Sequence, residues 1–469
     1  MSEQFAVLRK LLSQDLQAVH WKEIITHFDT WEDSDAKELA LSYARSHLSH
    51  WPPSSRVMPY QPQHRYWELA GGTIITKESE LTELTRHPHI KSLILSNQSI
   101  RHLRGLSVLQ ELEELVLDCQ QLTDLDALAE LPKLRQIKFD RTMPRDVRIL
   151  GELSSLQHLE FVDSFPHGLE ALTKWNSIET LIFSERDKYY RLKVWAPEDL
   201  LETVSKLSSL RELRLRRVRA KDVEPLALLE NLRSLGLRDS SLTDLTGLID
   251  IPELSHLDLS DCQAFTRVRG LTALTQLRSI HLNHCYGLRS IDELTPLEQL
   301  EALHISDCGV VKDLDKLSGF SQLKELDVSK LTLGEDASVL EELVQLEKLW
   351  MIECNSLRNV DGLSELSKLT SLDLTDCWSL QNLRGLAHLS NLQSLQTFGC
   401  SQLELIPEQK RMETREEVEN YQQRLRGERP DFYTDCPYCQ LEMGLQESTH
   451  SNEYTCPECQ GSFYVKDES

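Results

Sequence analysis

Two cysteine pairs near the C-terminal end form the strongest chemical pattern in this chain of 469 residues. They are Cys436-Pro-Tyr-Cys439 and Cys456-Pro-Glu-Cys459, and sixteen residues separate them. Each CxxC turn places two thiolates on one side of the chain, and two such turns complete the tetrahedron that Zn²⁺ prefers. Because all four ligands are cysteine, no coordination position stays open for a substrate. The pattern therefore predicts a structural Zn²⁺ site without catalysis at the metal.

The segment that holds these cysteines, 431–469, has few apolar residues and needs a metal to fold. It resembles a zinc ribbon. Iron in a rubredoxin-like site is the main alternative; a RING-type module would need eight ligands, and a thioredoxin-like redox pair would need a strand and a helix around the CxxC. Lys466 is the only lysine or arginine in the sequence after Arg429, against eight Asp or Glu residues. Since nucleic-acid affinity depends on basic contacts to phosphates, we expect this module to bind protein or to be structural.

A second candidate group recurs at intervals of 23 residues in the middle of the chain: Asp258, His281, His304, Asp327 and Trp350. If consecutive strands carry these residues, neighbours lie about 4.8 Å apart. Two imidazoles between carboxylates suit a metal ion, and hence a metal-dependent enzyme, or a pH-sensitive contact. The simpler interpretation is a polar face that binds a partner, and no arrangement of nucleophile and base accompanies the series.

A basic region lies where the repeats described below are interrupted. Residues 186–221 contain eleven Lys or Arg against five Asp or Glu, although the whole chain has a formal charge of −24. Arginine and aromatic side chains dominate interface hot spots. Six residues in or beside this region are therefore candidates for partner contact: Arg214, Arg216, Arg238, Tyr189, Tyr190 and Trp195. We expect them to bind an acidic segment, from a partner or from the chain itself. The alternative is that the arginines pair with acidic neighbouring repeats.

A repeated leucine-x-x-leucine-x-leucine pattern positions these candidates. Its first apolar residues, which we call anchors, follow one another in steps of 22 or 23 residues, with one step of 32. The anchors are Ile90, Leu112, Leu134, Leu156, Ile178, Leu210, Leu232, Leu254, Leu277, Leu300, Leu323, Leu346, Leu369 and Leu392. This period and core are typical of leucine-rich repeats, whose units stack to bury a common core. The predicted fold is α/β: a leucine-rich-repeat solenoid of about 14 repeats over residues 90–406, with a parallel sheet on its concave face and an insertion at about 185–200.

Counting from each anchor, the fifth and seventh side chains point outward from the strand, and the ninth turns inward. Six cysteines occupy the ninth position: Cys262, Cys285, Cys308, Cys354, Cys377 and Cys400. We expect them to be buried, reduced structural thiols. A disulfide between neighbours is the alternative. Reduced thiols fit the cytoplasm.

The segments at the two ends lack the repeat pattern. Residues 1–89 are predicted to form a helical cap on the first repeat, with one helical face over Leu8 to Val19 and a second helix from Ser34 to Leu48. A separate binding module is the alternative for this segment. Residues 407–430 are predicted to be a capping helix and linker that starts at Thr414, since Thr414-x-x-Glu417 is a capping box.

The repeats resemble the short repeats of internalins, in segments such as LEELVLDCQQLTDLDALAELPKL and LTSLDLTDCWSLQNLRGLAHLSNL. The resemblance implies a scaffold that binds proteins through its concave strands, and it carries over no catalytic residue. Cysteine stands where this family usually has asparagine at the ninth position. Internalins are secreted to the cell surface, whereas this chain starts without a secretory signal, so we expect a cytoplasmic location.

The composition of the chain argues against two classes of function, nucleic-acid binding and membrane association. The acidic charge argues against broad binding to nucleic acid or to an anionic membrane, and no apolar run approaches the ~20 residues that cross a bilayer. The predicted function is a non-catalytic adaptor that holds a protein partner on its concave face. The alternative is a nucleic-acid-associated regulator that uses the zinc module and residues 186–221.

Overall fold

The computed structural model describes residues 2–13, 18–29, 31, 35–48, 50–59, 71–84, 89–174, 177–185, 195–264, 266–405 and 411–427, with four short strands between 432 and 464. These residues belong to two units. Unit 1 comprises Met1–Arg238 and Asp250–Glu253, and unit 2 comprises Asp239–Ile249 and Leu254–Ser469.

Each repeat contributes one short strand, which begins two residues after its anchor. The strands of unit 1 are β1 (Val57–Pro59), β2 (Gly72–Ile75), β3 (Ser92–Ser96), β4 (Glu114–Asp118), β5 (Gln136–Phe139), β6 (His158–Val162), β7 (Thr180–Ser184), β8 (Glu212–Arg216) and β9 (Ser234–Arg238). Those of unit 2 are β10 (His256–Asp258), β11 (Ser279–His281), β12 (Ala302–His304), β13 (Glu325–Asp327), β14 (Lys348–Trp350), β15 (Ser371–Asp373), β16 (Ser394–Gln396) and β17 (Arg411–Met412). Within each unit, consecutive strands pair in parallel up to β9 and from β10 to β16. All fourteen anchors are buried, so the leucine pattern correctly predicted the fourteen strands from β3 to β16.

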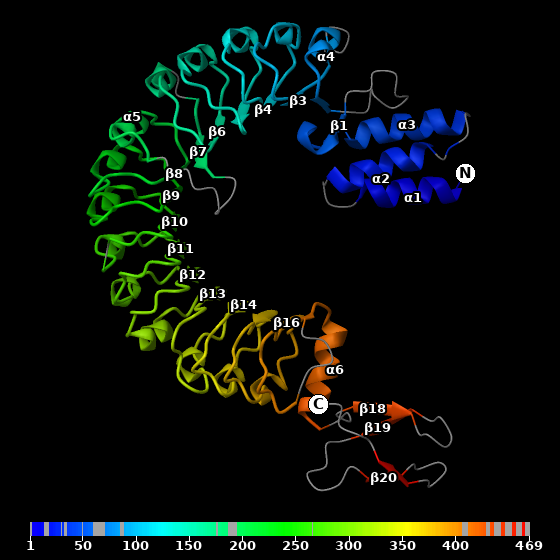
Figure 1. The fold of residues 1–469 in the computed structure, drawn as a ribbon, viewed down its shortest axis with the longest axis vertical. Helices are drawn as coiled ribbons and strands as arrows, with labels where there is room; N and C mark the ends of the chain where they lie inside the picture. The colour runs from blue at the N-terminus through cyan, green and yellow to red at the C-terminus, as the bar shows by residue number, and fades with distance from the viewer. Residues whose placement is uncertain are drawn as a thin grey trace. The chain divides into compact units, whose positions relative to one another are not determined.

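Short helical segments return the chain from one strand to the next and lie on the side of each unit opposite the strands (Figure 1). They are η4 (Leu106–Val108), η5 (Asp126–Glu130), η6 (Arg148–Glu152), η7 (Leu169–Lys174), α5 (Leu200–Val204), η8 (Glu224–Leu228), η9 (Thr246–Asp250), η10 (Leu271–Ala273), η11 (Asp292–Leu294), η12 (Leu314–Gly319), η13 (Ser338–Leu340), η14 (Asp361–Leu363) and η15 (Arg384–Leu386). Each of these segments buries at least one leucine, as Leu128, Leu226 and Leu363 show. The core of each unit therefore lies between the strands and these segments.

The eighth residue of most repeats has a left-handed backbone, which turns the chain at the end of the strand. Ten of these residues are not glycine: Arg141, Asp163, Arg217, Asp239, Asp261, His284, Asp307, Lys330, Glu353 and Asp376. Their φ angles lie between 51° and 66°, a region that side chains beyond glycine seldom occupy. The turn is held because the N–H of the eighth residue donates to the next repeat, as from Asp307 to the carbonyl of Ser329 at 2.9 Å.

The ninth-position cysteines form a column of buried thiols that supports these turns. Five of them donate to the carbonyl oxygen of the sixth residue in the preceding repeat, at 3.0 to 3.3 Å: Cys285, Cys308, Cys354, Cys377 and Cys400. Burial raises the pKa of Cys262 and Cys354 to about 12 and that of Cys400 to about 11. All seven cysteines that the structure describes are buried, and none of these seven is in a disulfide. The prediction that these thiols are buried is confirmed for this column.

Earlier repeats satisfy the same backbone groups with different side chains. Thr142, fully buried at a ninth position, donates to the carbonyl of Leu117 at 2.7 Å and accepts the N–H of Cys119 at 2.7 Å. Cys119 occupies an eighth position, yet its thiol donates to Leu95, again a sixth residue. The sixth-position carbonyl is thus a polar group that several repeats satisfy from within the core.

The N-terminal segment differs from its prediction in two respects. The expected face over Leu8 to Val19 is divided, because α1 (Ser2–Leu12) ends before α2 (Ala18–Asp29) begins. The hydroxyl of Ser13 donates to the carbonyl of Lys10 at 3.0 Å, and such local bonds compete with helix continuation. The second helix appears as predicted, as α3 (Asp35–Leu48); Ser34 lies outside the described residues. The parallel sheet also starts before Ile90, since η1 (Pro53–Arg56), β1, β2 and α4 (Glu78–Glu83) precede the first repeat.

The predicted C-terminal capping helix is present as α6 (Arg415–Leu425). Thr414 caps it, and the capping box with Glu417 is complete. The buried amide of Gln422 donates to the carbonyls of Leu386 and Leu389 at 2.6 and 3.1 Å. The last repeat of unit 2 is thereby covered by a helix that satisfies its open backbone groups.

Candidate functional site

The strand face of unit 2 is the surface formed by the outward side chains of β10 to β16. Residues alternate along each strand between partly exposed and buried, as in β11, β12 and β13. The parallel register sets the fifth-position residues side by side in one row: Asp258, His281, His304, Asp327, Trp350, Asp373 and Gln396. The structure therefore brings together the five residues that the 23-residue spacing singled out.

Two histidines stack at the centre of this row. The ring centroids of His281 and His304 are 4.2 Å apart, and their planes differ by 5°. The side chain of His304 is 14% exposed. Burial, and then the charge of His281, holds the pKa of His304 below its ordinary value, against the opposing effect of Asp327. The His304 imidazole is therefore neutral at pH 7 and offers an aromatic surface rather than a positive charge.

Trp350 continues the aromatic surface on the same side. Its ring centroid lies 5.7 Å from that of His304, with the planes at 36°. The two residues are two strands apart, a backbone separation of about 9.6 Å, so their rings lean toward each other over the intervening Asp327. The carboxylate of Asp327 lies 4.0 Å from Nδ1 of His304 and is 18% exposed. We call His281, His304 and Trp350 the aromatic ridge.

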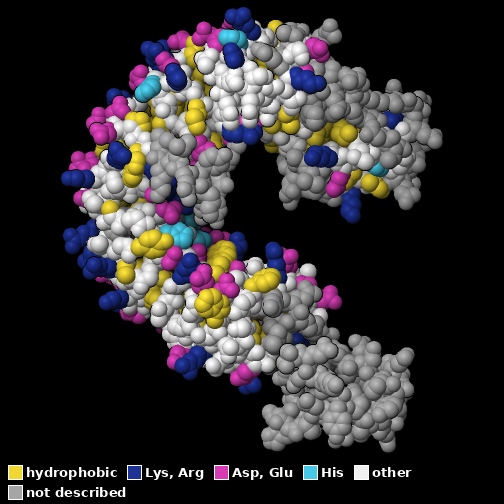
Figure 2. Space-filling model, viewed as in Figure 1, with side chains coloured by type: hydrophobic (Ala, Val, Ile, Leu, Met, Phe, Trp, Pro, Cys, Tyr) yellow, Lys and Arg dark blue, Asp and Glu magenta, His cyan; other side chains and the backbone are white. Residues whose placement is uncertain are grey.

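Carboxylates accompany the ridge along its length. Three fifth-position aspartates each accept, through Oδ1, the backbone N–H two residues ahead at 2.9 to 3.0 Å: Asp258, Asp327 and Asp373. This bond holds each carboxylate against its own strand. Figure 2 shows histidine, hydrophobic and acidic side chains gathered over the strands of unit 2. The face therefore combines aromatic area with negative charge.

The metal-dependent alternative for the Asp258 to Asp327 series is not supported by this geometry. Among the residues that the structure describes, no group of three or more His, Cys, Asp or Glu side chains is arranged to hold a metal ion. The two imidazoles lie face to face instead of pointing their nitrogens at a common centre. The row is suited to contact with a ligand through its ring surfaces and carboxylates.

A neighbouring row of eighth-position residues was missed in the sequence analysis. Asp307 lies at its centre, with Nδ1 of His284 and the hydroxyl of Tyr286 each 3.3 Å from its carboxylate. Lys330 lies 3.6 Å from both Asp307 and Glu353. Tyr286 is 52% exposed. Their equal spacing of 23 residues could have revealed the eighth-position residues in the sequence. The left-handed turn that directs these side chains outward cannot be predicted from the leucine pattern.

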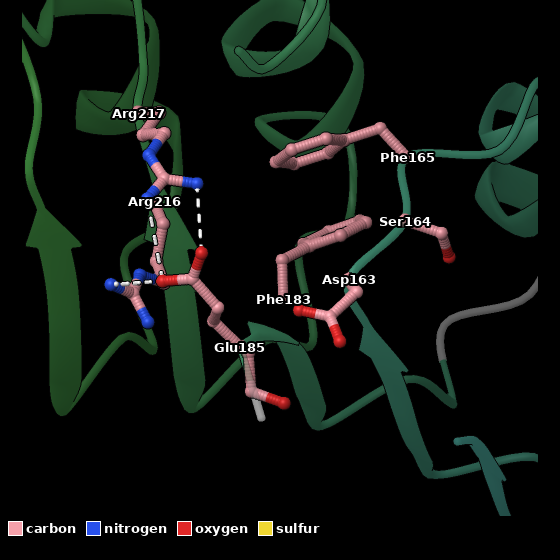
Figure 3. Close-up of a pocket in the computed structure, with 8 residues that line it drawn as sticks. Asp163, Ser164, Phe165, Phe183, Glu185, Arg216 and Arg217 are labelled. Carbon is pink, nitrogen blue, oxygen red and sulfur yellow. Dashed lines mark hydrogen bonds and ion pairs between the residues drawn. The ribbon is translucent and has the colours of Figure 1, made fainter. Parts of the chain in front are cut away.

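The arginines of the basic region pair mainly within unit 1. Arg216 and Arg217 both bind the carboxylate of Glu185, at 2.8 and 3.0 Å (Figure 3). Glu185 is 8% exposed, Arg217 11% and Arg216 22%. Arg214 is 60% exposed and lies 2.7 Å from Glu212. Arg216 and Arg217 therefore pair within the chain, as the alternative interpretation expected. Arg214 remains exposed, so its guanidinium is accessible to a partner.

A small pocket adjoins this cluster. The rings of Phe165 and Phe183 stack at 5.0 Å along one side, and Glu185 with its arginines forms the other (Figure 3). The pocket has a volume of about 30 Å³, which is room for one or two water molecules. It is too small for a substrate. The ion pairs of Glu185 and the stacked phenylalanine rings both line it.

The other candidates of the basic region are placed as follows. Arg238 lies beside Arg216 in the β8–β9 register and is half-buried. The guanidinium of Arg219 lies 4.9 Å from the ring centre of Trp195, a cation–π contact within the chain. Tyr189 and Tyr190 lie outside the described residues. The expected binding of an acidic segment here stays a prediction.

The four zinc-ligand candidates, Cys436, Cys439, Cys456 and Cys459, also lie outside the described residues. The strands beside them form two antiparallel pairs. They are β18 (Phe432–Asp435) with β19 (Glu442–Leu445), and β20 (Glu453–Thr455) with β21 (Ser462–Tyr464). In both pairs the first strand ends immediately before the CxxC, and the second begins three residues after it.

Comparisons with known proteins identify the fold. No protein-family model and no curated protein matches the chain. Solved structures do match. An internalin (inlF) of Listeria monocytogenes is 24% identical over 68% of this chain and 88% of its own length, with a TM-score of 0.51. A leucine-rich-repeat protein of Leptospira interrogans is 18% identical over 71% of this chain and 95% of its own length, with a TM-score of 0.47. The buried anchors, the parallel strands and the likeness to the internalin define a leucine-rich-repeat fold.

The described part of the chain contains no helix long and apolar enough to span a membrane.

Proposed function

We propose that this chain is a non-catalytic scaffold that binds a protein partner on the strand face of unit 2. The observation that carries the proposal is the row of fifth-position side chains, whose backbone is fixed by parallel pairing on both sides. Rigid strands present these side chains without a further ordering cost on binding. Aromatic and charged groups on such a surface supply the contact area and the specificity that protein interfaces use.

The basic region supports this function less well. Two of its arginines are committed to Glu185, which lowers the positive charge available to a polyanion such as nucleic acid. Arg216 and Arg217 therefore do not support the nucleic-acid alternative, and the net positive charge of residues 186–221 is the feature left in its favour. The exposed Arg214 remains a candidate for a secondary contact with the same partner.

The test is a crosslinked pull-down from native lysate, in nuclease-treated and untreated halves, with the full chain as bait. The matched bait carries Trp350→Ala. A discrete protein that survives nuclease and is lost with the variant is the expected result. A control bait with Trp378→Ala removes an exposed tryptophan at the tenth position of a repeat instead of the strand face, and it should retain the partner. Equal capture by all three baits would remove the strand face from the function.

We also propose that residues 431–469 form a zinc ribbon that is structural or makes a second protein contact. Both CxxC motifs lie in the sequence between two strands that pair with each other. This supports the proposal, because a zinc ribbon takes its two pairs of thiolates from two such segments. When bound, Zn²⁺ would supply folding energy to a segment that is poor in apolar residues. A reducing, cytoplasmic compartment fits both these thiolates and the buried thiol column.

Metal analysis of the purified full chain tests the ribbon. One zinc per chain is expected, and the double variant Cys436→Ser with Cys456→Ser should lose it. One iron per chain would favour the rubredoxin-like alternative, and a metal-free chain would refute the proposal.

A further inference from the structure

We propose that the strand face of unit 2 recognises an extended, arginine-rich segment of its protein partner. Guanidinium groups of this segment would stack on the aromatic ridge and pair with the carboxylates beside it. This inference rests on the proposed function and names the chemistry of the partner.

Charge is the first argument. The outward and turn positions of β10 to β16 carry eight carboxylates: Asp258, Asp261, Asp307, Glu325, Asp327, Glu353, Asp373 and Asp376. The same positions carry two lysines, and both already bind carboxylates, Lys348 with Glu325 at 2.8 Å and Lys330 with Asp307 at 3.6 Å. The face is therefore strongly negative at neutral pH, and a cationic partner complements it.

The aromatic ridge is the second argument, because it distinguishes arginine from lysine. A guanidinium is planar, weakly hydrated and stacks on aromatic rings, whereas an ammonium is a compact and strongly hydrated charge. His281, His304 and Trp350 offer three adjoining rings. Asp327 lies under the ridge, and Asp373 lies beside Trp350 in the β14–β15 register. A guanidinium on Trp350 can thus stack and pair with a carboxylate at the same time.

Dimensions are the third argument. From Asp258 on β10 to Asp373 on β15 there are five strand spacings, a span of about 24 Å. An extended peptide rises about 3.3 Å per residue, so about seven residues cover the row. Alternate side chains of such a peptide point to the same side and repeat about every 6.6 Å. Arginine at every second position would therefore present several guanidinium groups to the face.

The experiment measures fluorescence anisotropy of labelled twelve-residue peptides with the full chain at ~0.15 M salt, where diffuse surface attraction is screened beyond about 8 Å. The probes are three copies of Gly-Arg-Ser-Arg, the same peptide with lysine for arginine, and the same peptide with glutamate for arginine. The arginine peptide should bind, the lysine peptide should bind at least threefold more weakly, and the glutamate peptide should not bind.

Matched variants localise the binding. Asp327→Asn with Asp373→Asn removes two charges but keeps an oxygen that can accept the N–H of Ser329 or Thr375; it should weaken arginine-peptide binding roughly tenfold. Glu341→Gln with Glu365→Gln removes the same charge from exposed positions away from the strands and should change it less than twofold. Trp350→Ala should weaken it roughly fivefold and abolish the preference for arginine over lysine. Unchanged melting temperatures would exclude misfolding of the variants.

The opposite outcomes are distinct. Equal binding of the lysine and arginine peptides, with equal losses in both charge variants, would reduce the interaction to diffuse attraction and overturn the proposal. No binding of the arginine peptide would overturn it as well. If the pull-down still yields a partner that depends on Trp350, the scaffold function stands and only the arginine-rich partner is refuted. If the arginine peptide binds but no protein is captured, the scaffold function is the part that fails.

Discussion

Replacing Glu185 tests whether the buried ion pairs of unit 1 support its structure. The carboxylate binds Arg216 and Arg217 and is 8% exposed. Glu185→Gln keeps the shape but leaves two guanidinium groups without their counter-charge. Breaking a buried pair by removing one partner costs about 3–5 kcal/mol. Because Arg216 is 22% exposed and regains part of its hydration, we expect a loss of about 2 kcal/mol.

Hydrogen exchange measures this loss where it occurs. The N–H of Ala196 donates to Arg217 at 3.0 Å, and the N–H of Arg217 donates to Arg238 at 2.9 Å. Both amides open when this part of unit 1 loosens. A loss of 2 kcal/mol should accelerate their exchange about thirtyfold, since 1.4 kcal/mol corresponds to a factor of ten. A local measurement is preferable to a global melt, because long repeat arrays often unfold in more than one step.

The matched control is Glu212→Gln, which removes the same group from the exposed pair with Arg214. Exposed pairs contribute about 0–1 kcal/mol, so exchange of the same two amides should change less than fivefold. The double variant Glu185→Gln with Arg217→Met should recover part of the loss, because one of the stranded charges is gone. An equal effect of the two single variants would refute the reasoning, and so would acceleration below threefold for Glu185→Gln.

Three further predictions concern the core and the cap. Thr142→Val should cost about 1–3 kcal/mol in denaturant unfolding, because it leaves the buried N–H of Cys119 without its acceptor and removes one of the two hydrogen bonds to the carbonyl of Leu117, whereas Thr142→Ser should cost less than half as much. Burial raises the pKa of Cys262, Cys354 and Cys400 above that of an unfolded thiol, so the unfolded chain loses these protons first as the pH rises. The stability of unit 2 in urea titrations should therefore fall from about pH 8.5 to about pH 11, and a flat profile over this range would contradict the reasoning. Gln422→Ala should expose the carbonyls of Leu386 and Leu389 and increase proteolysis between β16 and α6. Gln423→Ala on the same helix should leave proteolysis unchanged. Equal cleavage of the two variants would show that α6 does not protect the repeat.

The repeat architecture was predictable because the same leucine pattern occurs in every repeat. Each anchor has buried partners three and five residues ahead, so fourteen copies of one short pattern fixed the strand positions. The capping box at Thr414 was equally local, and it correctly located α6. The division of the N-terminal helix was missed because its leucine pattern continues past Ser13, and only the hydroxyl contact with Lys10 shows where the helix ends.

The candidate site was predictable in part for a related reason. Equal 23-residue spacing placed Asp258, His281 and His304 on adjoining strands, and the register confirmed this. Spacing alone did not reveal that the rings of His304 and Trp350 close over Asp327, because that depends on side-chain torsions. Nor did it reveal that Arg216 turns to Glu185. The charge of a segment can be counted from sequence, but the partner of each charge depends on the fold.

The left-handed turn at the eighth position has a consequence for how this protein can change over time. Arginine, lysine, histidine, aspartate and glutamate all occupy it in this one chain, at nearly the same φ. That conformation costs about 1 kcal/mol or more for a residue other than glycine. The backbone hydrogen bonds between repeats therefore offset this cost, whichever side chain the position carries. The eighth position accepts either sign of charge on an unchanged backbone. Substitutions there can therefore change the charge at the ends of the strands one repeat at a time, without a new fold.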